Sequence, residues 1–349
     1  MKVLVIGGTK FLGYHLVREL LKKEHKVTLF NRGQTPDDFG RAVERIYGDR
    51  TRRGELGQQL KNLEFEVVVD MIAYRPEETE EAVQTFSGRV GHFIHISTGS
   101  VYIVTRDYPC PLRESDFFRE VIPRPVGQND WWVYGVNKRG CELVLREAFE
   151  ATEFPATIFR LPIVIGERDY TLRAYSYFLR VADGGPVLLP DAGMNVFTHV
   201  YQGDVVSTIA GNLLNGKTFG QAYNLAMEEI ISLRAFVQKS AEIIGKEVNI
   251  VDIPARLLEG LPMGTSFSPF SNRRPFVMAV EKARRDLNFL ATPFSSWLAR
   301  TINWFFTQYK GEPPANYRWR PLEVEVARKF IARMDELKNE CLSLEVKDG

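Results

Sequence analysis

The sequence predicts an α/β fold in which a doubly wound parallel sheet is followed by a smaller C-terminal α/β unit. Short apolar segments rich in β-branched residues alternate with stretches of helical periodicity through the first half of the chain, as in βαβ units. These segments are apolar throughout, as expected for parallel strands that are buried on both faces. Right-handed crossovers then place helices on both sides of one sheet.

The first elements run in the order strand, turn and helix. Residues 3–6 form the first strand, and leucines recur at helical spacing over residues 11–23. Helices are also predicted at residues 76–86, where a proline and acidic residues mark the N-terminus, and at residues 133–149. Further buried strands are predicted at residues 27–30, 45–47, 67–69, 93–96 and 156–161.

The strand–helix alternation weakens after residue 166, which indicates a second unit. We expect a dinucleotide-binding domain over residues 1–165, with residues 197–218 returning to it. Residues 166–196 and 219–309 are then the substrate-binding domain.

Residues 310–349 are expected to be a linker and a tail helix. The apolar side chains of Phe330, Met334 and Leu337 fall on one face of this helix, as does Cys341. We expect this face to dock on its own protein rather than on a partner.

The composition excludes several classes of protein. The 349 residues include 45 Lys and Arg against 44 Asp and Glu, so no charge surplus favours nucleic acid or an anionic membrane. Three widely spaced cysteines and five histidines without ligand spacing predict neither a disulfide framework nor a metal site. No apolar run reaches transmembrane length, and we expect a cytoplasmic protein.

The first turn has a glycine-rich sequence that suits a phosphate. Glycine lets the backbone turn sharply, and the helix N-terminus after it favours negative charge. Because the turn opens the first βα unit, we expect it to hold the pyrophosphate of a dinucleotide. The expected contacts are Gly7, Thr9, Lys10, Phe11, Leu12 and Gly13.

The end of the second strand favours NADP over NAD. An acidic residue there would bind the adenosine ribose and repel a 2′-phosphate, but the chain has Asn31 and Arg32. Both offer hydrogen-bond donors, and Lys10 adds a cation nearby. The alternative is that Arg32 and Lys10 are solvated surface charges, so NAD stays open.

Tyr134 and Lys138 form a candidate acid–base pair. They stand at i and i+4 of a predicted helix and therefore share a face. A nearby ammonium favours the ionised phenol, which can take a proton from a substrate hydroxyl or return it to a carbonyl. Hydride would meanwhile move to or from a nicotinamide.

The predicted fifth strand ends in hydroxyl side chains. Ser97, Thr98 and Ser100 follow it at the carboxyl edge of the sheet, where open α/β sheets bind ligands. A hydroxyl there could orient the reacting oxygen toward Tyr134. Simple turn chemistry is the alternative for each of them.

Together these motifs resemble the extended short-chain dehydrogenase/reductase family, also called the NAD-dependent epimerase/dehydratase family. The segments occur in the family's order: GGTKFLG, Gly48-Asp49-Arg50, STGSVY, YGVNK and RLPIVIG. The resemblance implies a Rossmann domain, a smaller substrate domain, a small-molecule substrate and a homodimer. It covers roughly residues 1–306.

The resemblance also implies roles for single residues. Thr98 would be the catalytic hydroxyl, Tyr134 the acid or base, and Lys138 its partner and an anchor of the cofactor ribose. Further residues would line the cofactor cleft: Asp49 and Arg50 by the adenine, Met71, Ile72 and Ala73 along the cleft, and Leu161 and Pro162 near the nicotinamide.

The implied function is an NADP- or NAD-dependent epimerase, dehydratase or reductase acting on a secondary hydroxyl or ketone of a sugar or nucleotide sugar. Departures from the family pattern weaken the nucleotide-sugar expectation. Ile163 stands where sugar-nucleotide epimerases have an asparagine that binds the diphosphate, and Asn195 stands near the position of a clamping arginine.

An alternative is an RNA-binding or regulatory protein without redox turnover. GGTKFLG and LFNRG are similar to a branch that includes chloroplast stem-loop-binding proteins. Five arginines lie in and beside one loop, and they suit either a patch that binds phosphate or RNA, or a solvated rim with one arginine near the adenine. They are Arg41, Arg45, Arg50, Arg52 and Arg53. We prefer the solvated rim because acidic residues intervene.

Overall fold

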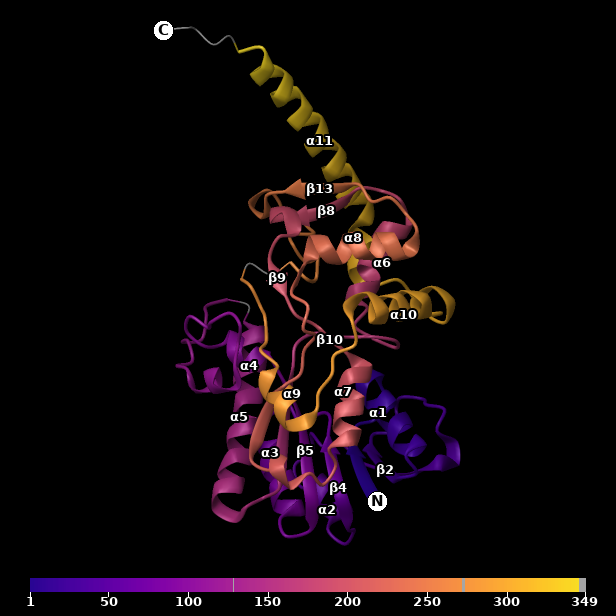
Figure 1. The fold of residues 1–349 in the computed structure, drawn as a ribbon, viewed down its shortest axis with the longest axis vertical. Helices are drawn as coiled ribbons and strands as arrows, with labels where there is room; N and C mark the ends of the chain where they lie inside the picture. The colour runs from indigo at the N-terminus through magenta and orange to yellow at the C-terminus, as the bar shows by residue number, and fades with distance from the viewer. Residues whose placement is uncertain (128, 272–273, 345–349) are drawn as a thin grey trace. The chain divides into compact units, whose positions relative to one another are not determined.

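The computed structural model describes residues 1–127, 129–271 and 274–344, and Figure 1 shows the course of the chain. The chain divides into two compact units, each built from three segments. Unit 1 comprises residues 1–170, 198–229 and 276–294. Unit 2 comprises residues 171–197, 230–275 and 295–349, of which the structure describes those up to 344.

Unit 1 contains a seven-stranded sheet in which every strand pair is parallel. Its strand order is β11-β6-β5-β4-β1-β2-β3, so the chain reverses direction across the sheet between β1 and β4. The strands are β1 (Lys2–Ile6), β2 (Lys26–Asn31), β3 (Val43–Tyr47), β4 (Phe65–Asp70), β5 (Val90–Thr98), β6 (Ala156–Leu161) and β11 (Gln221–Asn224).

Alternating side chains of each strand pack on opposite faces of this sheet. On β1, Val3 and Val5 join the apolar cluster that contains Leu16 of α1 (Phe11–Lys22) and Ile209 of α7 (Gln202–Gly211). Leu4 and Ile6 join the cluster on the other face. Residues of three further helices pack there, which are α2 (Glu55–Leu60), α3 (Pro76–Phe86) and α5 (Asp130–Thr152). The sheet is therefore doubly wound, as predicted.

Short elements complete unit 1. The long connection between β5 and α5 contains α4 (Ser100–Ile103) and the 3-10 helix η2 (Glu114–Phe118). A small parallel pair joins β7 (Val164–Ile165) to β10 (Val200–Tyr201). Helix α9 (Glu281–Leu287) follows in the third segment.

Unit 2 is a smaller α/β unit. Its parallel pair consists of β8 (Val187–Pro190) and β13 (Ile250–Ile253), and its antiparallel pair of β9 (Val196–Phe197) and β12 (Ile231–Ser232). The helices are α6 (Arg173–Ala182), α8 (Leu233–Ile244), α10 (Phe294–Thr307) and α11 (Arg320–Leu342). No helix among the described residues is long and apolar enough to cross a membrane.

The domain boundaries differ from the predicted ones. Residues 219–229 and 276–294, which we assigned to the substrate domain, belong to unit 1. The first of these segments contains β11, the edge strand of the sheet. Residues 310–344 pack within unit 2 rather than forming a separate linker and tail.

The tail helix α11 docks through only part of its length. Ala327 is fully buried and Phe330 packs against the same apolar cluster. Met334 and Leu337 are almost half exposed, and Cys341 is exposed. The prediction that the whole apolar face docks on its own protein is therefore wrong for the C-terminal half of the helix.

Candidate cofactor and catalytic site

The glycine turn after β1 has the backbone that the sequence predicts. Gly7 and Gly8 have φ angles of +104° and +91°, a region that favours glycine. A Cβ atom on Gly13 would lie 2.8 Å from the Cα atom of Gly8, so α1 can pack this closely only through glycine. The turn thus exposes bare backbone at the N-terminus of α1, which suits a phosphate.

A cavity of about 380 Å³ opens at this turn, entirely within unit 1. Its lining brings together most of the predicted cofactor residues, from four separate parts of the chain. These residues are Gly7, Lys10, Phe11, Leu12, Gly13, Asn31, Arg32, Asp49, Arg50, Met71 and Ile72. The cavity lies at the carboxyl ends of β1, β2 and β4, beside the β1–β4 reversal.

The remaining predicted cofactor residues lie outside this lining. Thr9 belongs to the glycine turn but is not part of the wall. Ala73 is fully buried and Leu161 almost so, while Pro162 is half-buried at the end of β6. Lys138 is 3% exposed and also contributes nothing to the cavity wall.

Asn31 presents a hydrogen-bond donor that the described part of the protein leaves unused. Its Oδ1 atom accepts the backbone N–H of Gly33 at 2.8 Å, while its buried Nδ2 atom has no partner. A buried donor without a partner is costly, and a ligand oxygen would satisfy it. This orphaned amide and the bare glycine turn fit the ribose and pyrophosphate of a dinucleotide.

Arg50, which the resemblance places by the adenine, lines the cavity, and its guanidinium is already paired inside the protein. Its guanidinium is 2% exposed, pairs with the buried carboxylate of Asp70 and donates to the backbone oxygen of Glu78. Asp49 lies at the surface, where hydrogen bonds from Thr51 lower the pKa of its carboxyl. Arg50 is therefore part of the cavity wall, and the carboxylate of Asp70 neutralises its charge.

The arginine cluster does not form a free cationic patch. Arg45 makes a bidentate pair with Asp37 at 2.6 and 2.9 Å, and Arg52 lies 3.9 Å from Glu55. With Arg50 buried, three of the five arginines have acidic partners. This arrangement agrees with a solvated, locally neutralised rim.

The hydroxyl side chains at the end of β5 lie in two different environments. Ser97 is 4% exposed and donates to the carboxylate of Glu142. Thr98 is half-buried, accepts the backbone N–H of Ser100 at 3.2 Å and lies 3.3 Å from its hydroxyl. Thr98 thus has turn chemistry, and it is also the more accessible of the two hydroxyls on the strand.

Helix α5 carries Tyr134 at the surface and Lys138 in the interior. The tyrosine is 38% exposed, and its ring centroid lies 6.2 Å from that of Tyr74. The Lys138 ammonium donates to the backbone oxygens of Ala73 and Ile96, each at 2.7 Å, and lies 3.1 Å from Nε2 of His95. Burial lowers the pKa of Lys138. A charged group held by three acceptors therefore lies one helical turn from an accessible phenol.

Sequence reasoning did not predict Tyr74, Tyr170 or His95 as residues of this site. Tyr74 and Tyr170 line the cavity, and the ammonium of Lys10 lies 5.7 Å from the ring centroid of Tyr170. Burial raises the pKa of Tyr74 to about 12. His95 is buried on β5 and contacts Lys138 directly. The local sequence indicates only that His95 lies on a buried strand. Its role depends on Lys138, which comes from α5.

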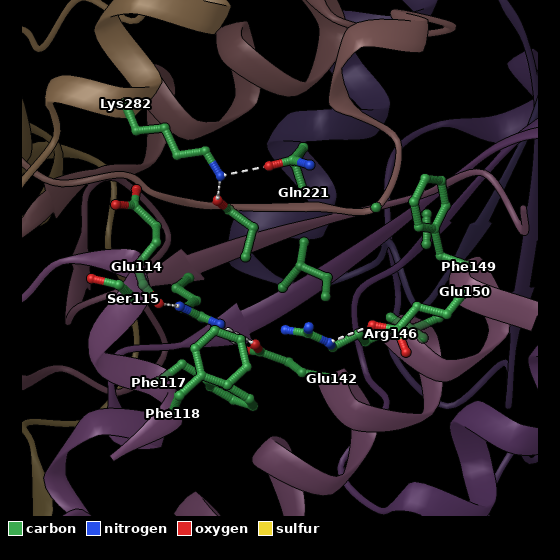
Figure 2. A pocket seen from close by; sticks show the side chains of 16 residues that line it. Glu114, Ser115, Phe117, Phe118, Glu142, Arg146, Phe149, Glu150, Gln221 and Lys282 are labelled. Atoms are coloured by element: carbon green, nitrogen blue, oxygen red, sulfur yellow. Dashed lines mark hydrogen bonds and ion pairs between the residues drawn. The ribbon is translucent and has the colours of Figure 1, made fainter.

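Unit 1 has a second cavity, of about 400 Å³, which none of the predicted site residues lines. Figure 2 shows Lys282 reaching toward Gln221, and Glu142 is among the other residues that line the cavity. Glu142 forms a buried pair with Arg160 and accepts the hydroxyl of Ser97. Among the described residues, no cluster of His, Cys, Asp or Glu is arranged to hold a metal ion.

Known proteins of similar sequence include a stem-loop binding protein and a reductase. The chloroplast stem-loop binding protein of 41 kDa b from Arabidopsis thaliana is 24% identical over 257 residues, which are 70% of this chain and 63% of that protein. The chain thus spans less than two thirds of that relative. The 2′-dehydrokanamycin reductase of Streptomyces kanamyceticus is 23% identical over 259 residues, 73% of this chain and 70% of the enzyme.

A solved structure shares the fold across nearly the whole chain. The UDP-glucuronic acid 4-epimerase from Bacillus cereus in complex with NAD superimposes with a TM-score of 0.68 at 19% identity, covering 89% of this chain and 100% of that one. The model of the NAD dependent epimerase/dehydratase family matches residues 3–226, more than half of the 349 residues. The chain therefore belongs to the NAD-dependent epimerase/dehydratase family.

Proposed function

We propose that this protein is a nicotinamide-dependent oxidoreductase that interconverts a secondary alcohol and a ketone on a sugar or nucleotide sugar. The observation that carries the proposal is the buried Lys138 ammonium one helical turn from the exposed phenol of Tyr134. Two features of the cavity in the same unit support it: the glycine turn and the unpartnered amide of Asn31.

Tyr134 is the proposed acid or base. A fixed positive charge favours the ionised phenol, which can remove a proton from a substrate hydroxyl. In the reverse direction the phenol returns that proton to the ketone oxygen. When bound, the nicotinamide cofactor supplies or accepts the hydride.

Thr98 is proposed to orient the reacting oxygen. It ends β5 at the carboxyl edge of the sheet, and its hydroxyl lies in a turn rather than in the core. Lys138 acts on Tyr134 through its charge, because its three donors already have acceptors within the protein.

NADP is the proposed cofactor in preference to NAD. Asn31 and Arg32 end β2 with donors and no acid, and Lys10 stands in the glycine turn. A 2′-phosphate would meet hydrogen-bond donors there instead of a repelling carboxylate. A sugar-like substrate is supported by the relative named 2′-dehydrokanamycin reductase.

Substitution of the proposed acid or base tests the function. With NADPH and a panel of keto sugars that includes 2′-dehydrokanamycin, Tyr134→Phe should lower turnover by at least 100-fold, since general acid–base catalysis contributes roughly 10²–10⁴-fold. Calorimetric titration should show NADPH affinity within about threefold of wild type. Tyr309→Phe removes a phenol that lies outside the cavity lining, so it serves as the control. An unchanged rate in Tyr134→Phe would reject the assignment.

RNA binding is a second candidate, favoured by the relative named as a stem-loop binding protein. The neutralised arginines of the rim weigh against it. A gel-shift titration of a stem-loop RNA across a salt series, with and without NADP, distinguishes the two functions. Tight binding that survives in Tyr134→Phe, without turnover in the wild type, would favour the RNA-binding function.

A further inference from the structure

His95 lies on β5 directly against the proposed catalytic lysine. Its side chain is fully buried, and its Nε2 atom is 3.1 Å from Nζ of Lys138. The other two acceptors of that ammonium are backbone oxygens, those of Ala73 and Ile96. His95 therefore supplies the one side chain among the three acceptors that hold Lys138.

The contact fixes the protonation state of the imidazole. An ammonium has only donors, so Nε2 of His95 must be the bare, accepting nitrogen. The ring hydrogen then lies on Nδ1, which is buried and has no partner among the described residues. Burial, with Lys138 and Arg50 nearby, holds the pKa of His95 well below its ordinary value, so the ring stays neutral.

A purely structural core residue would not need this arrangement. An aliphatic side chain at position 95 would pack between the sheet and α5 without leaving a buried N–H unpaired, a defect that lowers stability. The neutral ring instead places an acceptor on the ammonium. This acceptor partly offsets the burial of Lys138, which on its own favours loss of the proton.

We propose that His95 is a positioning residue for the reaction: its neutral imidazole accepts a hydrogen bond from Lys138 and keeps that ammonium charged and fixed behind Tyr134. The inference rests on the proposed function, because it assigns His95 a role in the same acid–base site. It extends that function to a residue that touches neither substrate nor cofactor.

The surrounding charges determine how the site responds to pH. The ionisable groups packed around His95 and Lys138 come from the loop after β3, from β4, from the loop that follows it, from α3 and from α5. Those that act directly on the two side chains are Arg50, Asp70, Tyr74, Cys141 and Glu142. Glu78 lies 4.0 Å from Arg50, and the ring centroid of Tyr134 lies 6.2 Å from that of Tyr74. Because Arg50 is paired with Asp70, Lys138 depends on neutral acceptors for its hydrogen bonds.

Two substitutions of His95 distinguish the effect of its hydrogen-bond acceptor from the effect of its side-chain volume. His95→Gln keeps an acceptor near the position of Nε2, whereas His95→Leu removes it. Loss of one hydrogen bond to a charged group should lower the pKa of Lys138 by about one unit. The basic limb of the pH–rate profile should move to lower pH by the same amount in His95→Leu and should stay in place in His95→Gln.

Nuclear magnetic resonance reads the same contact without turnover. In ¹⁵N-labelled wild type, Nε2 of His95 should have the shift of an unprotonated nitrogen from roughly pH 5 to 8. The ¹³Cε titration of Lys138, assigned with Lys138→Arg, should fall by about one unit in His95→Leu. These measurements do not require turnover. If no keto sugar is turned over, that result counts against the proposed function but not against the contact between His95 and Lys138.

Two results would overturn the role of His95. One is a His95→Leu protein whose Lys138 titrates as in the wild type and whose pH–rate profile is unchanged. The other is a protonated Nε2 in the wild type. If His95→Leu fails to fold, the wild-type nitrogen shifts and His95→Gln decide the question.

Discussion

Arg50 and Lys138 are charged side chains that are buried beside the cofactor cavity, and each has hydrogen-bond partners within the protein. Arg50 meets Asp70 and a backbone oxygen, and Lys138 meets two backbone oxygens and His95. A buried charge costs several kcal/mol when it has no partner, so each of these contacts constrains the others. The charges of Arg50 and Lys138 are therefore compensated from inside the protein, whereas the Nδ2 atom of Asn31 in the cavity wall has no partner among the described residues.

Removal of Arg50 should be among the most destabilising single changes in unit 1. In Arg50→Met the carboxylate of Asp70, which is fully buried, loses its cation. We expect the free energy of unfolding to fall by about 3–5 kcal/mol, measured by urea denaturation. Arg52→Ala is the matched control, because that side chain is 77% exposed and should change stability by less than about 0.5 kcal/mol. Equal losses in both variants would contradict the buried-pair interpretation.

Sequence reasoning identified the residue types of the site better than their environments. The types follow from local chemistry, such as glycines in a turn or a phenol four residues before a lysine. The burial of Arg50 depends on Asp70, twenty residues further along the chain, and His95 depends on Lys138 from α5. No local pattern in the chain encodes such pairs.

At the scale of elements, the unit of β1, glycine turn and α1 is specified almost entirely by local sequence. The predicted helix at residues 76–86 matches α3, and the predicted strand at residues 156–161 matches β6, for the same reason. Strand β11 went unrecognised because it has only four residues and is fixed by distant groups. Glu114 accepts the N–H of Asn224, and Lys282 donates to the oxygen of Ala222.

Glycine at position 13 should be essential for nucleotide binding. In Gly13→Ala the new methyl group would lie 2.8 Å from the Cα atom of Gly8, so the turn must move away from α1. We expect the affinity for NADPH to fall at least tenfold, measured by calorimetric titration. Gly211→Ala in α7 is the control, since its Cβ atom meets nothing within 4 Å and alanine favours the helix. Unimpaired binding by Gly13→Ala would mean that the turn does not hold the nucleotide.

At the scale of the whole molecule, unit 2 is assembled from segments far apart in sequence. The buried pair between Arg180 of α6 and Glu323 of α11 joins residues 143 positions apart. Arg320 reaches Asp183 across 137 positions. The sequence predicted a helix at the end of the chain, but these long-range pairs determine that its first half packs in unit 2 and its second half does not.

The attachment of α11 should weaken in acid because of Asp183. Burial raises the pKa of this carboxyl, but hydrogen bonds from Arg320 and Tyr317 outweigh that effect and hold it below its ordinary value of 3.8. A carboxyl with a lowered pKa in the folded state adds stability above its unfolded pKa, and this stability is lost as the pH falls through the folded value. Thermal unfolding followed by circular dichroism from about pH 6 to pH 3 should therefore show a steeper loss for the wild type than for Asp183→Asn. Glu325→Gln removes an exposed carboxylate of the same helix and should retain the wild-type slope. If Asp183→Asn kept that slope as well, the Arg320–Asp183 contact would not be what fastens α11 to unit 2.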